Sequence, residues 1–138
     1  MVGVDGSGHG DAALLWAAHE AARRGARLEV VHAAFLRHEA VELFAPGLAD
    51  EEESLLERDV ARARQAEPGL EVEGRLEEPP AADALIRAGQ GAEMLVVGSR
   101  GLGALQSLTL GSVSRECVTR AHCPVVVIQA EAGPAQAD

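Results

Sequence analysis

Short apolar runs alternate with helical patterns along the whole chain, and this alternation restricts the possible fold more than any other feature. Five runs have the character of strands, and four longer stretches between them have the spacing of helices. Because parallel neighbours need long crossover connections, the order predicts an α/β fold with a doubly wound, five-stranded parallel sheet. The predicted strands are residues 2–5, 28–34, 70–76, 94–97 and 123–129, and the predicted helices are residues 12–24, 50–65, 79–87 and 112–121.

The length of the chain favours a single domain. Its 138 residues are close to the commonest domain size, and an apolar content of 47% is enough to fill one core. The last residues are small and polar, so we expect a folded domain over residues 1–130 and a disordered tail over residues 131–138. No apolar run approaches the roughly 20 residues that span a bilayer, and the start lacks the pattern of a signal peptide. We therefore expect a cytoplasmic protein with no membrane association.

Composition excludes several classes of function. A net charge of -10 and an aromatic content of 2% disfavour a nucleic-acid partner, because such partners need basic residues for phosphates and aromatic rings for bases. All twelve basic residues are arginine, which removes phosphate-loop and Schiff-base lysines. A phospho-accepting receiver needs a lysine near the end of its fold, so the absence of lysine disfavours this class too. A flavin carrier would stack aromatic side chains on the ring, and the chain has no tyrosine.

The stretch that says most about function follows the fourth predicted strand. The strand runs into Gly98, Gly101 and Gly103, and nine residues separate Gly101 from Gly111 and Ser112. In open α/β sheets ligands bind beyond the carboxyl ends of strands, and glycine lets them approach the backbone. Gly111 and Ser112 precede a predicted helix, whose free N–H groups and hydroxyl suit an anion. The G-x2-G-x9-G-S pattern therefore predicts a site for a ligand that carries phosphate.

Other reactive residues have simpler interpretations. His32 lies within a predicted strand and is expected to be a packed or hydrogen-bonded core histidine. Cys117 and Cys123 have neither zinc-knuckle nor CxxC spacing, so we expect two reduced, partly buried thiols. The acidic run DEEE, residues 50–53, is expected to be a solvated helix start and no metal site, because consecutive carboxylates on a helix point in different directions. Asp11 is expected to cap the first helix.

Five segments of the chain resemble the universal stress protein family, and together they cover almost the whole chain. They are VGVDGS at residues 2–7, VVHA at 30–33, LVVGSRGLG at 95–103, LGSVS at 110–114 and CPVVVI at 123–128. The spaced glycine motif resembles the ATP-binding branch of the family. The resemblance implies a Rossmann-like single domain with sheet order 3-2-1-4-5. It also implies a homodimer through the last strand, which begins at Val125 and ends at Gln129.

The resemblance also implies a set of ligand-binding residues. The carboxylate of Asp5 would lie by the ribose and adenine, and backbone at Val4 and Ala33 would border the adenine. The ribose and phosphate side would be lined by Val97, Gly98, Arg100 and Gly101, and the phosphates would be held by Gly111, Ser112, Val113 and Ser114. The implied ligand is ATP with magnesium.

None of the matched positions supplies a general base or a nucleophile, so no catalytic residue is assigned and turnover is expected to be slow or absent. The expected function is a nucleotide-dependent stress-response module, in which ATP orders residues 101–111 and changes the surface offered to an unidentified regulatory partner. The alternative is a slow ATPase or adenylate-handling enzyme of the same fold. Residues 36–49 receive no assignment from the motifs.

Overall fold

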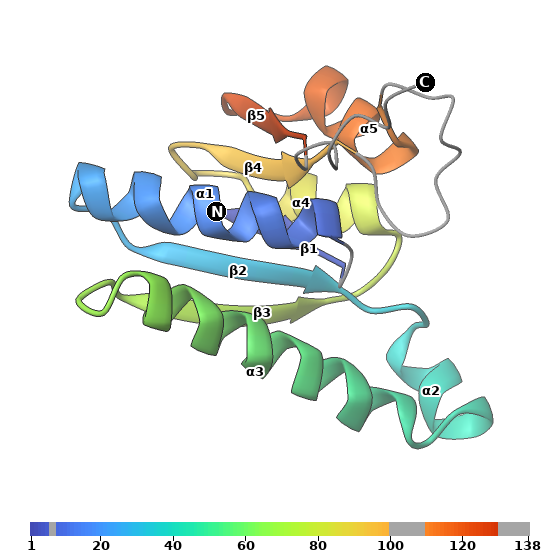
Figure 1. Ribbon diagram of the computed structural model, residues 1–138. Coiled ribbons are helices and arrows are strands. Elements are labelled where there is room, and N and C mark those ends of the chain that lie inside the picture. The colour runs from blue at the N-terminus through green and yellow to red at the C-terminus, as the bar shows by residue number, and fades with distance from the viewer. Residues whose placement is uncertain (6–7, 100–109, 130–138) are drawn as a thin grey trace, which may run out of the picture.

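Five parallel strands form one sheet in the order β3-β2-β1-β4-β5, as Figure 1 shows. The computed structural model describes residues 1–5, 8–99 and 110–129. The predicted tail, Arg100 and Gly101 lie outside these residues. The sheet order confirms the predicted doubly wound α/β fold. The strands are β1 (Val2–Val4), β2 (Leu28–Ala33), β3 (Val72–Glu77), β4 (Leu95–Gly98) and β5 (Val125–Ile128).

Helices cover both faces of the sheet (Figure 1). On one face α1 (Gly8–Arg24) packs against α3 (Leu48–Ala66) and against the central strands. On the other face α4 (Ala81–Ala88) packs beside α5 (Ser112–Arg120). The short α2 (His38–Phe44) projects from the body after β2. None of the described helices is long and apolar enough to cross a membrane.

The two faces have separate apolar cores, and β1 serves both. Val2 and Val4 are buried among the side chains of α1 and α3. Gly3 faces α4, where a Cβ atom would lie 2.7 Å from Cδ1 of Leu85. The glycine therefore lets α4 approach the central strand closely, because any larger residue would displace Leu85. Cys117 is fully buried in the second core.

The structure corrects two predictions about helices on the first face. Helix α1 begins at Gly8 rather than at Ala12, so Asp11 lies in its first turn and is not its cap. The Asp11 carboxylate instead pairs with Arg62 of α3, with 2.8 Å between Oδ1 and Nη1. The acidic start of α3 is not solvated throughout, because Glu52 is only 3% exposed. A further helix, α2, occupies part of the segment that the motifs left unassigned.

Candidate functional site

The carboxyl ends of β1 and β4 lie side by side at the point where the strand order reverses. The chain proceeds from β1 outward to β2 and β3, and then returns to β4 on the other side of β1. Connections leave in opposite directions there, and in doubly wound folds ligands bind beyond the carboxyl ends of the strands at such a point. The structure thus brings the predicted residues at the ends of β1, β2 and β4 to one edge.

Strands β1 and β2 provide one side of this edge. Val4 pairs with His32 in the parallel ladder, so Asp5 and Ala33 follow at the same level. Val4 is 8% exposed, whereas Asp5 and Ala33 are partly exposed. A ligand at this edge would therefore meet the backbone at the strand ends, one carboxylate and one small apolar side chain.

The tip of β4 and the start of α5 form the other side, and a backbone bond joins them. The amide of Gly111 donates to the carbonyl of Ser99 at 2.6 Å, and the amide of Ser99 donates to Ile128 of β5 at 2.9 Å. The two ends of the intervening loop are thereby held together. Gly98, the last residue of β4, is partly exposed beside this junction.

The first turn of α5 offers free backbone donors. Gly111 is the cap residue in extended conformation, with φ of -72° and no side-chain cap, and the first helical bond runs from the Arg115 amide to its carbonyl. The amides of Ser112, Val113 and Ser114 precede that bond and have no acceptor within the helix. Such amides at the positive end of the helix dipole attract anions.

The two serines of the motif lie in different surroundings. Ser112 is exposed at the start of α5. Ser114 is 3% exposed, and its hydroxyl lies 2.9 Å from the carbonyl oxygen of Ser99 and 3.1 Å from that of Gly111. Its predicted role as a hydroxyl donor to phosphate stays a prediction, because backbone carbonyls already accept its proton here. In this arrangement Ser114 holds the junction between β4 and α5.

Three residues of this region were not assigned to the site from the sequence. Ser99 acts through its backbone, so its side chain gave no signal within the glycine motif. Glu52 looked like part of a solvated acidic run, yet its carboxylate accepts a hydrogen bond from the Phe35 amide at 2.7 Å. His32 is 5% exposed and its Nδ1 lies 3.0 Å from the Val4 carbonyl oxygen, which confirms it as a hydrogen-bonded core histidine.

No candidate metal cluster is found in the part of the chain that the structure describes, and one of its two thiols is deeply buried. No group of three or more described His, Cys, Asp or Glu residues could hold a metal ion. Both cysteines are free, and burial raises the pKa of the Cys117 thiol to about 11. A thiol with so high a pKa is a poor nucleophile at neutral pH. Both thiols are free, as predicted, but Cys117 is fully buried rather than partly buried.

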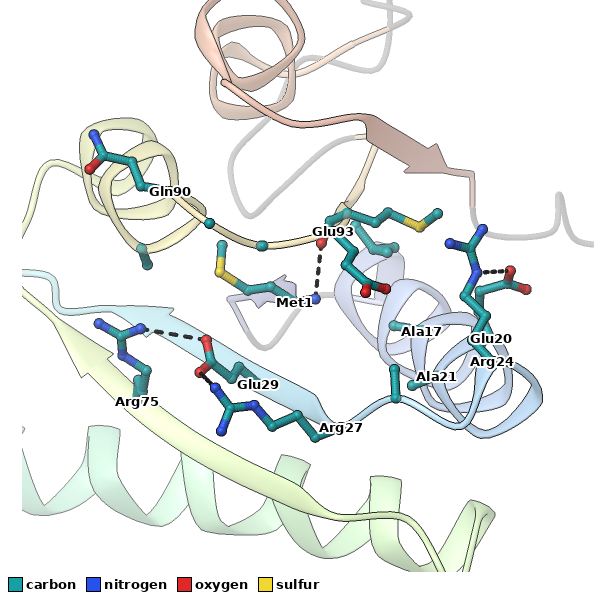
Figure 2. A pocket seen from close by; sticks show the side chains of 16 residues that line it. Met1, Ala17, Glu20, Ala21, Arg24, Arg27, Glu29, Arg75, Gln90 and Glu93 are labelled. Carbon is teal, nitrogen blue, oxygen red and sulfur yellow. Dashed lines mark hydrogen bonds and ion pairs between the residues drawn. The ribbon is translucent and has the colours of Figure 1, made fainter.

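A cavity of about 410 Å³ lies at the opposite, amino-terminal edge of the sheet, between the ends of α1 and α4 (Figure 2). None of the predicted ligand residues lines it. Most of its charged side chains pair with one another: Arg24 Nε lies 2.7 Å from Glu20 Oε1, and Arg27 Nη2 lies 3.6 Å from Glu29 Oε1. Charged groups that already pair with one another are less available to a charged ligand. We therefore place the candidate site at the carboxyl edge.

Comparisons with known proteins agree with the fold and the motifs. Residues 1–129 match the universal stress protein family (Usp). The chain belongs to the universal stress protein family. A universal stress protein of Mycobacterium tuberculosis is 35% identical over 131 residues, which cover 95% of this chain and 48% of that protein. The chain thus spans about half the length of its mycobacterial relatives. One of Thermus aquaticus is 36% identical over 145 residues, which cover 94% of this chain and 96% of that protein.

Solved structures of the family have the same architecture. A universal stress protein in complex with cAMP superimposes with a TM-score of 0.76 at 27% identity, covering 94% of this chain and 95% of its own. The protein of Archaeoglobus fulgidus in complex with dAMP has a TM-score of 0.68 at 26% identity, covering 92% of this chain and 94% of its own. Both neighbours thus hold adenine nucleotides.

Proposed function

We propose that this universal stress protein binds ATP at the carboxyl edge of its sheet and acts as a nucleotide-dependent regulatory module with slow or no hydrolysis. The observation that carries the proposal is the junction at Ser99, which holds Gly111 and the free amides of α5 beside the tip of β4. Phosphates need such amides, and the ribose needs close access to backbone, which Gly98 permits. The adenine nucleotides bound by the two solved neighbours support the same ligand class.

The residues at the edge suit each part of an adenine nucleotide. Asp5 would accept hydrogen bonds from ribose hydroxyls, and Ala33 leaves room for a flat base. On the other side the first-turn amides of α5 and the exposed Ser112 hydroxyl would donate to phosphate oxygens. Asp5 is the one carboxylate among the matched positions, so magnesium would be held mainly by phosphates and water, as is usual for this ion.

Regulation would follow from the two ends of the loop that the Ser99 junction brings together. Phosphates bound at Gly111 would contact this junction. A ligand shifts a conformational equilibrium only through contacts that differ between the two states. We therefore place the ligand-dependent surface, and the contact with a regulatory partner, around this junction.

Titration calorimetry with ATP and magnesium tests the proposal, and Gly111→Val is the decisive variant. The extended backbone at Gly111 admits any residue, but a valine side chain would stand where the amides must face phosphate. We expect ATP affinity to fall by more than about tenfold, which is roughly 1.4 kcal/mol. Affinity equal to that of the wild type in a folded variant would refute the phosphate assignment.

The matched control is Gly69→Val, in the turn before β3. A Cβ atom there would meet nothing within 4 Å, and the backbone is not left-handed. This variant makes the same chemical change away from the carboxyl edge, so it should bind ATP like the wild type. If the control also lost binding, the effect of Gly111→Val would not report on the site.

A further inference from the structure

Two buried polar side chains lie beneath the carboxyl ends of β1 and β2. His32 of β2 is 5% exposed and Glu52 of α3 is 3% exposed. Each side chain holds a backbone group at the edge that we assign to the adenine. Neither residue belongs to the glycine motif.

The imidazole of His32 fixes the peptide that follows β1. Its Nδ1 lies 3.0 Å from the carbonyl oxygen of Val4. A carbonyl oxygen only accepts, so Nδ1 must carry the proton and donate it. Because the peptide unit is planar, a fixed Val4 carbonyl also fixes the amide of Asp5 and limits the direction of its side chain.

The carboxylate of Glu52 fixes the chain that leaves β2. Its Oε1 accepts a hydrogen bond from the Phe35 amide at 2.7 Å, two residues beyond Ala33. The strand has ended there, so this bond replaces the next ladder contact. His32 and Glu52 therefore hold the ends of two neighbouring strands at the same edge of the sheet.

One ring nitrogen in this arrangement makes no hydrogen bond with the described part of the chain. The second ring nitrogen of His32, Nε2, is buried with no hydrogen-bond partner in the described structure, and it lies 3.8 Å from Oε1 of Glu52. In a neutral ring that nitrogen presents a lone pair to a carboxylate, and a buried unpaired polar atom is unfavourable. Groups that lower stability are typical of functional sites.

We propose that His32 and Glu52 are positioning residues for the adenine side of the nucleotide site: His32 holds the Val4 carbonyl and Glu52 holds the Phe35 amide. The inference rests on the proposed nucleotide site. Neither side chain need touch the nucleotide. Both set the directions of the backbone groups that border it.

The test compares His32→Asn with His32→Gln. The amide nitrogen of asparagine can occupy the place of Nδ1 and donate to Val4, whereas glutamine carries its amide farther out, near the place of Nε2. We expect His32→Asn to keep ATP affinity within about twofold and His32→Gln to lose at least about fivefold, the equivalent of one ordinary hydrogen bond. Rescue by asparagine alone separates the Val4 contact from general packing, since both variants remove the ring.

Glu52 supplies an independent pair of variants if the His32 variants do not fold. Glu52→Gln keeps an oxygen that can accept from the Phe35 amide, so it should retain ATP affinity. Glu52→Leu removes the acceptor and should weaken binding at least about fivefold. Circular dichroism and denaturant unfolding check that each protein is folded.

The outcomes separate this inference from the proposed function. A wild type that binds no adenine nucleotide would refute the proposed function. A wild type that binds ATP, with folded His32→Gln and Glu52→Leu proteins of equal affinity, would refute the positioning role alone. The positioning role is supported if ATP affinity falls in His32→Gln but not in His32→Asn. It is supported likewise if affinity falls in Glu52→Leu but not in Glu52→Gln.

Discussion

Ser112 and Ser114 carry the same hydroxyl two residues apart, but the surroundings of the two hydroxyls differ. Ser112 is exposed, whereas the Ser114 hydroxyl is buried against the Ser99 carbonyl. We expect Ser112→Ala to weaken ATP binding severalfold and to leave the free energy of unfolding within about 0.5 kcal/mol of the wild type. Ser114→Ala should lower the free energy of unfolding by about 1 kcal/mol, because a buried hydrogen bond is lost while the Ser99 carbonyl still accepts from the Gly111 amide.

Calorimetry and urea unfolding on both variants check this pair of effects, and each variant is the control for the other. If Ser114→Ala left stability unchanged and abolished ATP binding, the Ser114 hydroxyl would be a direct ligand of phosphate. That result would support the role implied by the family resemblance.

At the residue scale the sequence revealed positions whose type matters and missed those that act through the backbone. Gly98 and Gly111 were assigned to the proposed site because glycine suits a close approach of a ligand to the backbone. Ser99 was not assigned to the site, because its contact with the Gly111 amide uses a backbone carbonyl, which every residue type has. Glu52 was misjudged as solvated because its burial depends on β2 and the Phe35 amide, 17 residues earlier in the chain.

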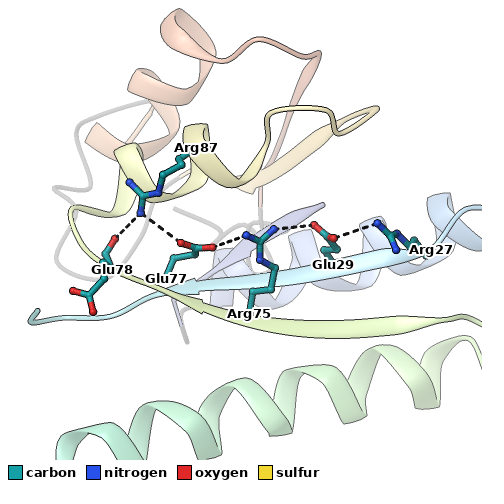
Figure 3. Close-up of polar contacts among 6 residues, drawn as sticks. All are labelled: Arg27, Glu29, Arg75, Glu77, Glu78 and Arg87. Carbon is teal, nitrogen blue, oxygen red and sulfur yellow. Dashed lines mark hydrogen bonds and ion pairs between the residues drawn. The ribbon is translucent and has the colours of Figure 1, made fainter. Parts of the chain in front are cut away.

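Among the elements, β3 shows how one strand uses its two faces differently. On the face toward α3, a Cβ atom at Gly74 would lie 2.9 Å from Cγ2 of Val60 and 3.1 Å from Cγ of Leu56. On the other face, Arg75 belongs to a row of exposed ion pairs (Figure 3). Its guanidinium lies 2.7 Å from Glu77 and 3.5 Å from Glu29.

Substitutions at Gly74 and Arg75 should therefore lower the free energy of unfolding by different amounts, and the two losses should depend differently on salt. Gly74→Ala should lower the free energy of unfolding by about 1–3 kcal/mol at any ionic strength, because the added methyl crowds α3. Arg75→Gln should lower it by less than about 1 kcal/mol, and the difference should shrink in concentrated salt, because exposed ion pairs are screened. Urea unfolding at low and high sodium chloride measures both. A large, salt-independent loss for Arg75→Gln would contradict this account.

The elements found from the sequence were those with a buried, periodic face. All five strands and four of the helices were placed to within a few residues. Helix α2 was missed because Val41 is its one buried residue, and the residue before it, Arg37, makes no side-chain cap. The start of α1 was missed because Gly8 and Gly10 are poor helix formers, so the pattern became helical only later.

At the scale of the whole molecule, strand β5 lies at an edge of the sheet, where a strand of a second copy of the chain could pair with it. The carbonyls of Pro124 and Ile128 accept bonds from β4, so the even-numbered residues face β4 and Val127 directs its amide outward. The apolar residues of β5 remain partly exposed. We expect a homodimer that pairs residues 125–129 across a two-fold axis, because unpaired apolar edges favour strand addition.

Val127→Pro tests this dimer, because proline removes one outward N–H without breaking the β4 ladder. Val127→Thr is the control, since it keeps the amide and a β-branched side chain. Light scattering should give a dimer for the wild type and the threonine variant, and a monomer for the proline variant. A wild-type mass of one chain at micromolar concentration would exclude the dimer.

The whole site also decides between a binding module and an enzyme. Rapid ATP hydrolysis needs a group that activates water or accepts a proton. The described part of the site offers backbone amides, the Ser112 and Ser114 hydroxyls and the Asp5 carboxylate, which we place by the ribose. No described base is hydrogen-bonded to either hydroxyl, and the Ser114 proton is directed to backbone carbonyls. We therefore expect bound ATP to stay largely intact over minutes.

A single-turnover assay with radiolabelled ATP measures the rate of phosphate release, with Ser112→Ala beside the wild type. We expect release far slower than about once per second, near the low end of ordinary enzyme turnover. Ser112→Ala should shorten the time for which ATP is retained and leave the slow release rate unchanged, because its hydroxyl holds phosphate without activating water. Release at about once per second would make the protein an ATPase. The catalytic group would then have to come from outside the described residues or from the bound magnesium.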